Sequence, residues 1–136
     1  MTIDQCLNGL RFLHKVKHQI HRDLKPENIL MNSLGEVKLT DFGISKQLGS
    51  TIDFASSFIG TMTYMSPERI QCKPYTYASD IWSFGIIVYE MAVGSLPFPA
   101  CKKLIEALQY IGSAKDIELP ADLPISLELR NFVEYW

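Results

Sequence analysis

Apolar residues recur at helical intervals in four stretches of the chain. Residues 2–18 predict an amphipathic helix with Thr2 as a candidate N-cap. Residues 79–93 are apolar on almost every side and predict a buried helix, which Pro97 and Pro99 follow. Residues 102–111 predict another amphipathic helix, and Ser126 is expected to begin a last helix that runs to Trp136.

Between these helical stretches, residues 29–31 and 37–39 predict two short strands. The turn-prone sequence of residues 32–35 separates them, which is typical of a hairpin. Because a hairpin returns the chain to its starting point, we expect it to bring Asn28 close to Asp41. Residues 44–59 are small and polar and predict a loop, as do residues 119–124. The expected fold class is therefore α+β and predominantly helical.

Composition narrows the function classes. Apolar residues make up 47% of the chain, charged residues 21%, and the formal net charge is −2, so the basic excess typical of a nucleic-acid-binding protein is missing. No apolar run reaches about eighteen residues and no signal peptide opens the sequence, so we expect a cytoplasmic protein with no membrane partner. Cys6, Cys72 and Cys101 lack metal-ligand spacing and are interpreted as reduced thiols.

The strongest chemical signal is the run His21-Arg22-Asp23-Leu24-Lys25-Pro26-Glu27-Asn28. It matches the protein-kinase catalytic loop H-R-D-L-x-x-x-N at all five fixed positions. A charged surface loop would explain one acidic or basic residue but not this order. Phosphoryl transfer needs a carboxylate that accepts the proton of the attacking hydroxyl, a metal ion and positioned cations. Asp23 is the expected base and Asn28 an expected Mg²⁺ ligand.

Two further signatures follow in the expected order. Asp41-Phe42-Gly43 begins eighteen residues after Asp23, and its Asp41 is the second expected Mg²⁺ ligand. The tripeptide is a weak signal by itself, but its place after the predicted hairpin supports it. Ser66-Pro67-Glu68 is a variant of the A-P-E motif. The chain therefore resembles a protein kinase.

The resemblance is most specific to the MAP kinase kinase family. It is carried by Gly60-Thr61, by the run Tyr64–Arg69 and by the run Ser79–Ser83. It implies an enzyme that uses ATP and Mg²⁺ to phosphorylate threonine and tyrosine in a MAP kinase activation loop, and that an upstream kinase activates. Lys25, two residues after the base, is similar to the lysine of serine/threonine kinases and favours serine/threonine or dual specificity.

The resemblance also implies roles for particular residues. Catalytic roles fall on Asp23, Lys25, Asn28 and Thr61, and ATP-binding roles on Lys25, Glu27, Asn28, Leu30 and Asp41. Structural roles fall on His21, Arg22, Phe42, Gly43, Glu68 and Asp80. In the family pattern His21 packs against Phe42, Glu68 pairs with an arginine beyond the last helix, and Asp80 anchors the catalytic loop. From the residues alone, Asp80 could also be a helix cap, which is the less favoured interpretation.

With the flanking motifs, residues 44–59 are interpreted as an activation segment. Ser57 is the expected principal phosphosite and Thr51 the second, while Asp53 stands where a further site would fall. Arg22 supplies a cation that an added phosphate can pair with. In the first helix, His14, Lys15 and Lys17 could form an anion site, but a solvated polar face is the preferred interpretation.

The motifs leave two functions open. Only twenty residues precede His21, and they contain neither a G-x-G-x-x-G loop nor a V-A-I-K strand. Residues 1–136 are therefore expected to be a partial kinase domain, from helix αE to the start of helix αH, truncated at both ends and without the small N-terminal lobe. One candidate is a MAP kinase kinase-like enzyme of which this chain is a fragment, inactive by itself. The other is a non-catalytic C-lobe that serves as a binding or scaffold module.

Overall fold

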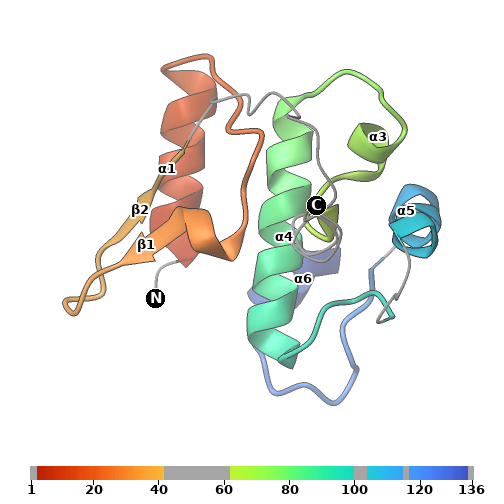
Figure 1. The fold of residues 1–136 in the computed structure, drawn as a ribbon. Helices are drawn as coiled ribbons and strands as arrows, with labels where there is room; N and C mark the ends of the chain where they lie inside the picture. The colour runs from red at the N-terminus through yellow and green to blue at the C-terminus, as the bar shows by residue number, and fades with distance from the viewer. Residues whose placement is uncertain (1–2, 42–61, 100–103, 115–116, 135–136) are drawn as a thin grey trace.

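The computed structural model describes residues 3–41, 62–99, 104–114 and 117–134 (Figure 1). The elements in chain order are helix α1 (Ile3–Lys15), a single 3₁₀ turn η1 (Pro26–Asn28), strands β1 (Ile29–Met31) and β2 (Val37–Leu39), and helices α3 (Pro67–Ile70), α4 (Tyr77–Val93), α5 (Leu104–Ser113) and α6 (Leu127–Glu134). The described part of the chain is mostly helical with one small sheet, which agrees with the predicted class.

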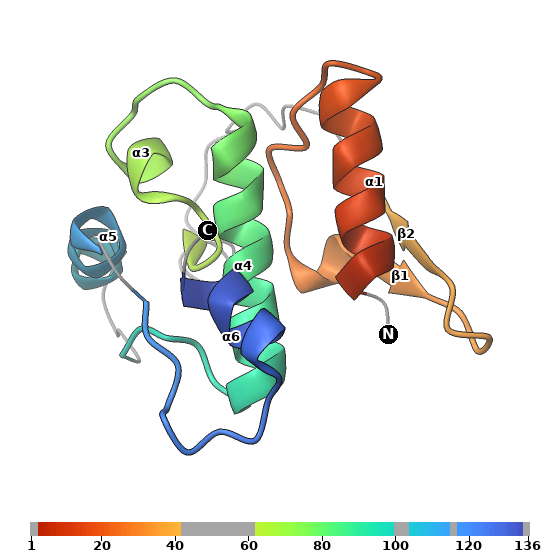
Figure 2. The same cartoon turned by 180° about the vertical axis from the view of Figure 1, so that it is seen from behind.

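Helices α1 and α4 lie side by side at the centre of the molecule. Figures 1 and 2 show the β1–β2 hairpin against the outer side of α1, α6 across the face of α4 that Figure 2 turns toward the viewer, and α5 on the side of α4 away from α1. Leu10 of α1, Phe84 and Val88 of α4 and Val133 of α6 form the middle of one hydrophobic core. Because α4 is apolar on almost every side, it can contact elements on several of its faces at once.

The predicted hairpin is confirmed. The strands are antiparallel, with Ile29 opposite Leu39 and Met31 opposite Val37. The backbone N–H of Thr40 donates to the carbonyl of Asn28 at 2.9 Å, so the pairing continues one step beyond the strands. Asp41 follows directly, which places it at the same end of the hairpin as Asn28.

Gln5 fixes the hairpin to helix α1. Its side-chain oxygen accepts a hydrogen bond from the N–H of Val37 at 2.8 Å, and its amide nitrogen donates to the carbonyl of Gly35 at 3.2 Å. Gly35 adopts φ 79° in the turn, a conformation that glycine reaches without steric cost. A polar residue of α1 therefore sets the distance between the hairpin and the helix.

The helix ends differ from the predicted bounds. Helix α1 ends at Lys15 rather than at residue 18, and His18 beyond it adopts a left-handed φ of 52°. Helix α4 begins at Tyr77, two residues early, because the N–H of Thr76 donates to the Ser79 hydroxyl at 3.2 Å and closes the first turn.

The other two helix predictions were closer. Helix α5 extends to Ser113, two residues beyond the predicted end, while residues 102–103 lie outside the described residues. The Ser126 hydroxyl accepts the N–H of Leu129 at 3.2 Å, so Ser126, which was expected to begin the helix, caps α6 one residue before its start at Leu127. The short helix α3 was not predicted.

Two further expectations concern thiols and membranes. Cys6 is a buried free thiol and Cys72 an exposed one, while Cys101 lies outside the described residues. In the ranges that the structure describes, no helix combines the length and the apolar character needed to cross a bilayer.

Candidate active site

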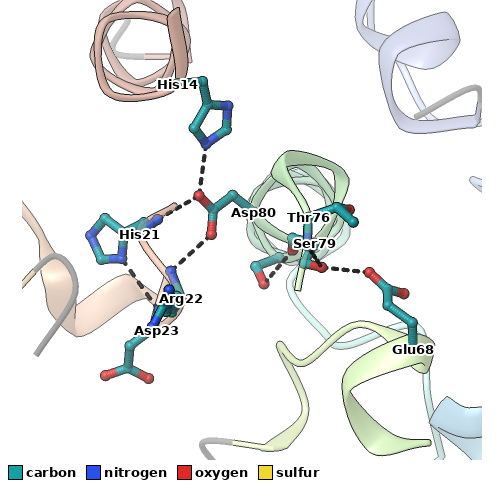
Figure 3. Close-up of polar contacts among 9 residues, drawn as sticks. His14, His21, Arg22, Asp23, Glu68, Thr76, Ser79 and Asp80 are labelled. Atoms are coloured by element: carbon teal, nitrogen blue, oxygen red, sulfur yellow. Dashed lines mark hydrogen bonds and ion pairs between the residues drawn. The ribbon is translucent and has the colours of Figure 1, made fainter. Parts of the chain in front are cut away.

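Asp80 of helix α4 holds the segment that contains the kinase motif (Figure 3). Its Oδ2 accepts a hydrogen bond from the backbone N–H of His21 at 2.7 Å, and its Oδ1 accepts one from the N–H of Arg22 at 3.0 Å. Only 1% of the residue is exposed, so these donors replace the water that a buried carboxylate loses. Asp80 could have been a loop anchor or a helix cap. The structure shows that it contacts the loop and is not a cap, since it lies inside α4.

His14 provides a third contact to Asp80. Its Nε2 lies 2.7 Å from Asp80 Oδ2, and its ring packs on Tyr77 with 4.6 Å between the ring centroids. His14 is buried, so the expectation of a solvated face was wrong for this residue, although Lys15 and Lys17 are exposed. The missed signal was spacing, since His14 follows Leu10 by four positions on the apolar face of α1.

Arg22, between the anchored His21 and Asp23, has a left-handed φ of 72°. Its carbonyl oxygen accepts a hydrogen bond from Arg69 Nη1 at 2.6 Å and one from the Tyr75 hydroxyl at 3.3 Å. Burial lowers the pKa of Arg69, against the nearby charges of Asp23, Asp80 and Glu68, which raise it. Sequence reasoning assigned no role to Arg69 or Tyr75.

The structure brings Asp23, Lys25 and Asn28 together. Lys25 Nζ lies 3.3 Å from Asp23 Oδ2, and Asn28 Nδ2 donates to Asp23 Oδ2 at 3.2 Å and to the Asp23 carbonyl at 2.7 Å. The η1 turn makes this possible because it returns the chain toward Asp23. The Asp23 side chain keeps 38% of its surface exposed, so a substrate can reach its carboxylate.

Asn28 and Asp41 are suited to a divalent cation. Asn28 points its amide nitrogen at Asp23, which makes its Oδ1 the atom for a hard metal ion, and Asp41 is exposed at the same end of the hairpin. Within the described ranges, no group of three or more His, Cys, Asp or Glu could hold a metal without other ligands. The donor set fits Mg²⁺ that takes part of its coordination from phosphate oxygens and water.

His21 is a buried, neutral support for the loop. Its Nδ1 accepts the N–H of Asp23 at 3.4 Å. Burial lowers the pKa of His21, although the charges of Asp80, Asp23 and Asp41 and a backbone hydrogen bond with Thr40 act in the opposite direction. The imidazole therefore stays uncharged beside the candidate base.

Residues 62–66 are fixed to α4 beside the loop. The Ser83 hydroxyl donates to the Tyr64 carbonyl at 2.7 Å, and the Tyr64 hydroxyl donates to Glu90 Oε2 at 2.6 Å. Burial and the hydrogen bond to Glu90 raise the pKa of Tyr64 well above its usual value. Tyr64 therefore remains a hydrogen-bond donor at neutral pH.

Glu68 has partners within the described residues. The family pattern implies an arginine partner beyond the last helix, and in the described residues the Ser79 hydroxyl donates to Glu68 Oε1 at 2.6 Å (Figure 3). Burial acts to raise the pKa of Glu68, yet the hydroxyls of Ser79 and Ser66, a backbone N–H and the charge of Lys73 outweigh it and lower the pKa. Hydroxyl groups therefore satisfy this carboxylate within the described residues, and the pairing of Glu68 with an arginine beyond the last helix stays a prediction.

The remaining predicted site residues divide into two groups. Leu30 of β1 and Glu27 of η1 are exposed near the loop, with Leu30 55% exposed. A second group lies outside the described residues and comprises Phe42, Gly43, Thr51, Asp53, Ser57 and Thr61. Packing of His21 against Phe42 and the positions of the phosphosites stay predictions.

Comparisons with known proteins identify the family. The protein kinase domain model matches residues 1–135. A mitogen-activated protein kinase kinase 5 of Leishmania mexicana is 44% identical over 135 residues, which cover 93% of this chain and 25% of the relative. The mitogen-activated protein kinase kinase SIPKK of Nicotiana tabacum is 55% identical, and mitogen-activated protein kinase kinase 1 of Arabidopsis thaliana 54%, each over 94 residues, 69% of this chain.

The chain spans about a quarter of the length of these relatives, from 25% to 27%. The family match extends over nearly the whole sequence and includes every motif described above. The chain belongs to the protein kinase family, and it is MAP kinase kinase-like in sequence.

Proposed function

We propose that this chain supplies the catalytic loop and the Mg²⁺-binding residues of an ATP-dependent protein kinase that phosphorylates a MAP kinase activation loop. The observation that carries the proposal is the cluster of Asp23, Lys25 and Asn28 on a loop that Asp80 holds in place. Positioning and charge stabilisation provide most of the catalysis in phosphoryl transfer, and this cluster offers both.

Asp23 is the proposed base. Lys25 and Asn28 both contact its Oδ2, so they orient the carboxylate and leave Oδ1 to accept the proton of the substrate hydroxyl. Lys25 also brings a positive charge next to the position where negative charge develops on the transferring group. A lysine at this position supports serine and threonine as acceptors.

Asn28 and Asp41 are the proposed Mg²⁺ ligands, and Lys25, Glu27 and Leu30 the further contacts to the nucleotide. When bound, MgATP supplies the phosphoryl group together with a cation that neutralises its charge. Leu30, whose side chain is 55% exposed, offers an apolar surface beside the polar cluster.

The proposed substrates and regulators come from the relatives. Several are named mitogen-activated protein kinase kinases, and a relative from Dictyostelium discoideum is named a dual specificity one. A MAP kinase is therefore the proposed substrate, with tyrosine as well as threonine accepted and Thr61 assisting at the site.

An upstream kinase is proposed to phosphorylate Ser57 and Thr51, and the proposed location is the cytoplasm. Loss of activation in Ser57→Ala, measured after treatment with an activating kinase, is the expected result.

The test compares the 136-residue chain with a chimera in which it replaces the matching segment of the Leishmania mexicana relative. The 136 residues contain no G-x-G-x-x-G loop, so the chain by itself should transfer negligible phosphate from radiolabelled ATP. Positioning can contribute about 7–11 kcal/mol, and most of it should be missing without a second lobe over the nucleotide. The chimera should phosphorylate a MAP kinase, and Asp23→Asn should abolish that activity.

The unmodified relative is the positive control for the assay. A chimera that binds MgADP but phosphorylates no MAP kinase would contradict the proposal and favour the scaffold function. Turnover by the 136-residue chain alone, abolished by Asp23→Asn, would instead show that it needs no second lobe.

A further inference from the structure

Arg22 is held in a strained conformation from two sides. A φ of 72° is uncommon for a residue with a β-carbon, so surrounding contacts must maintain it. On one side the Arg22 N–H donates to Asp80 Oδ1 at 3.0 Å. On the other side the Arg22 carbonyl accepts hydrogen bonds from Arg69 at 2.6 Å and from Tyr75 at 3.3 Å.

Arg69 and Tyr75 are arranged as a pair around that carbonyl. Arg69 lies in α3 and Tyr75 lies just before α4. The guanidinium of Arg69 stacks on the Tyr75 ring at 4.2 Å, and the guanidinium of Arg22 lies 5.9 Å from the same ring. Stacking on an aromatic face restricts where a planar guanidinium can direct its N–H groups. The ring therefore helps to aim Arg69 at the Arg22 carbonyl.

We propose that Arg69 and Tyr75 are positioning residues for the catalytic loop, which fix the peptide unit between Arg22 and Asp23 and thereby the place of the Asp23 carboxylate. The proposal rests on the proposed function of Asp23 as the base. It adds a second attachment to the one that Asp80 makes.

The physical reason lies in the planarity of the peptide bond. The Arg22 carbonyl and the Asp23 N–H belong to one rigid plane, so fixing the oxygen fixes the direction in which the chain enters Asp23. Asp80 holds the preceding plane through the Arg22 N–H. With both planes held, the two dihedral angles of Arg22 are determined. Without Arg69, Arg22 can relax from its strained φ and carry Asp23 with it.

The first measurement is steady-state kinetics on the full chain within the chimera described above. Arg69→Met keeps an unbranched apolar stem but removes the guanidinium with its donors, and it should lower kcat about tenfold while the KM for ATP stays unchanged. Tyr75→Phe keeps the ring and should have a smaller effect. Arg69→Lys restores a charged donor and should recover part of the loss. The matched control is Lys73→Met, an exposed cation four residues from Arg69 in the sequence, which should leave kcat unchanged.

The second measurement does not depend on activity. Hydrogen exchange of the Arg22 and Asp23 amides should be at least threefold faster in Arg69→Met than in Lys73→Met, whereas amides in the middle of α4 should exchange equally in both. If Arg69→Met lost protection throughout α4, the variant would be destabilised as a whole. Tyr75→Phe, which keeps the aromatic packing, would then be compared with Lys73→Met instead.

The outcomes separate this inference from the proposed function. A chimera without turnover would contradict the proposed function. The hydrogen-exchange comparison would still test whether Arg69 and Tyr75 position the loop. Equal exchange at Arg22 and Asp23 in every variant, or a loss that appears in KM rather than in kcat, would overturn it. A kcat loss that Lys73→Met shares would overturn it as well.

Discussion

Cys72 shows how the backbone can limit stability at a single residue. It follows α3 with a φ of 56°, and its side chain is exposed, so no packing is lost when it is changed. A left-handed residue with a β-carbon costs about 1–2 kcal/mol, while glycine loses about 0.5–1 kcal/mol of conformational entropy on folding. Cys72→Gly should therefore raise the free energy of unfolding by up to about 1 kcal/mol in chemical denaturation. Cys72→Ala keeps the β-carbon and should give no such gain.

His21 should make the stability depend on pH. Its pKa in the folded chain is lower than its ordinary value of 6.5, so below pH 6.5 the unfolded chain takes up a proton that the folded chain refuses. The contribution of His21 is complete above pH 6.5 and is lost as the pH falls toward its folded pKa. The free energy of unfolding, measured by chemical denaturation between pH 8 and 5, should fall as the pH falls. In His21→Phe its slope against pH should be smaller.

The matched control is His18→Asn, which removes an exposed imidazole outside the loop and keeps a residue that tolerates the left-handed conformation. If the slope of the unfolding free energy against pH were the same in His21→Phe as in the unchanged chain, groups other than His21 would be responsible for it.

At the scale of residues, local motifs were readable from the sequence and long-range partners were not. The motif around Asp23 needs five residues close together in the chain, so its order alone identified it. Arg69 reaches Arg22 across 47 residues and Tyr75 across 53, and neither shows a pattern that marks its partner. His14 was misinterpreted because its polar side chain was given more weight than its place on an apolar helix face.

At the scale of elements, the end of α4 depends on Gly94. This residue has a φ of 80°, and its N–H donates to the Glu90 carbonyl at 2.8 Å. A β-carbon there would meet nothing within 4 Å, so the cost of a side chain is conformational. Gly94→Ala should lower the free energy of unfolding by about 1 kcal/mol in a denaturant titration.

Gly112 in α5 is the matched comparison for Gly94. A β-carbon at Gly112 would make only ordinary contact with Ile70, at 3.4 Å, and the φ of Gly112 is not in the left-handed region. Gly112→Ala should raise stability by up to about 1 kcal/mol because alanine favours the helix. Equal effects of the two substitutions would contradict the assignment of the Gly94 cost to its φ.

The elements predicted best were those with a clear period. The hairpin had its strands and turn chemistry in the sequence, and α4 had enough apolar length to be recognised. Helix α3 has four residues, which is little more than one turn, so no periodicity could reveal it. In the sequence, Pro67, where α3 begins, was recognised only as part of the Ser66-Pro67-Glu68 motif.

At the scale of the whole molecule, apolar surface gathers around α1 and the hairpin. Phe12 and Val16 are 51% and 60% exposed, and Leu30, Met31 and Leu34 are 55%, 66% and 83% exposed. Such surface favours association in water. The 136-residue chain should therefore self-associate in sedimentation velocity, and Met31→Thr with Leu34→Glu should shift it toward monomer. Leu127→Glu, which changes an exposed residue of α6, is the control and should have less effect.

The attachment of the catalytic loop to Asp80 has a consequence for the order of folding. The two hydrogen bonds from the loop backbone span 59 and 58 residues, and closing a chain segment of that length costs roughly 3–4 kcal/mol of entropy. During synthesis at about 5–20 residues per second, the loop leaves the ribosome roughly 3–12 seconds before Asp80 does. The nascent chain must therefore carry the proposed catalytic residues in an immature arrangement until α4 has been synthesised and docks against the loop.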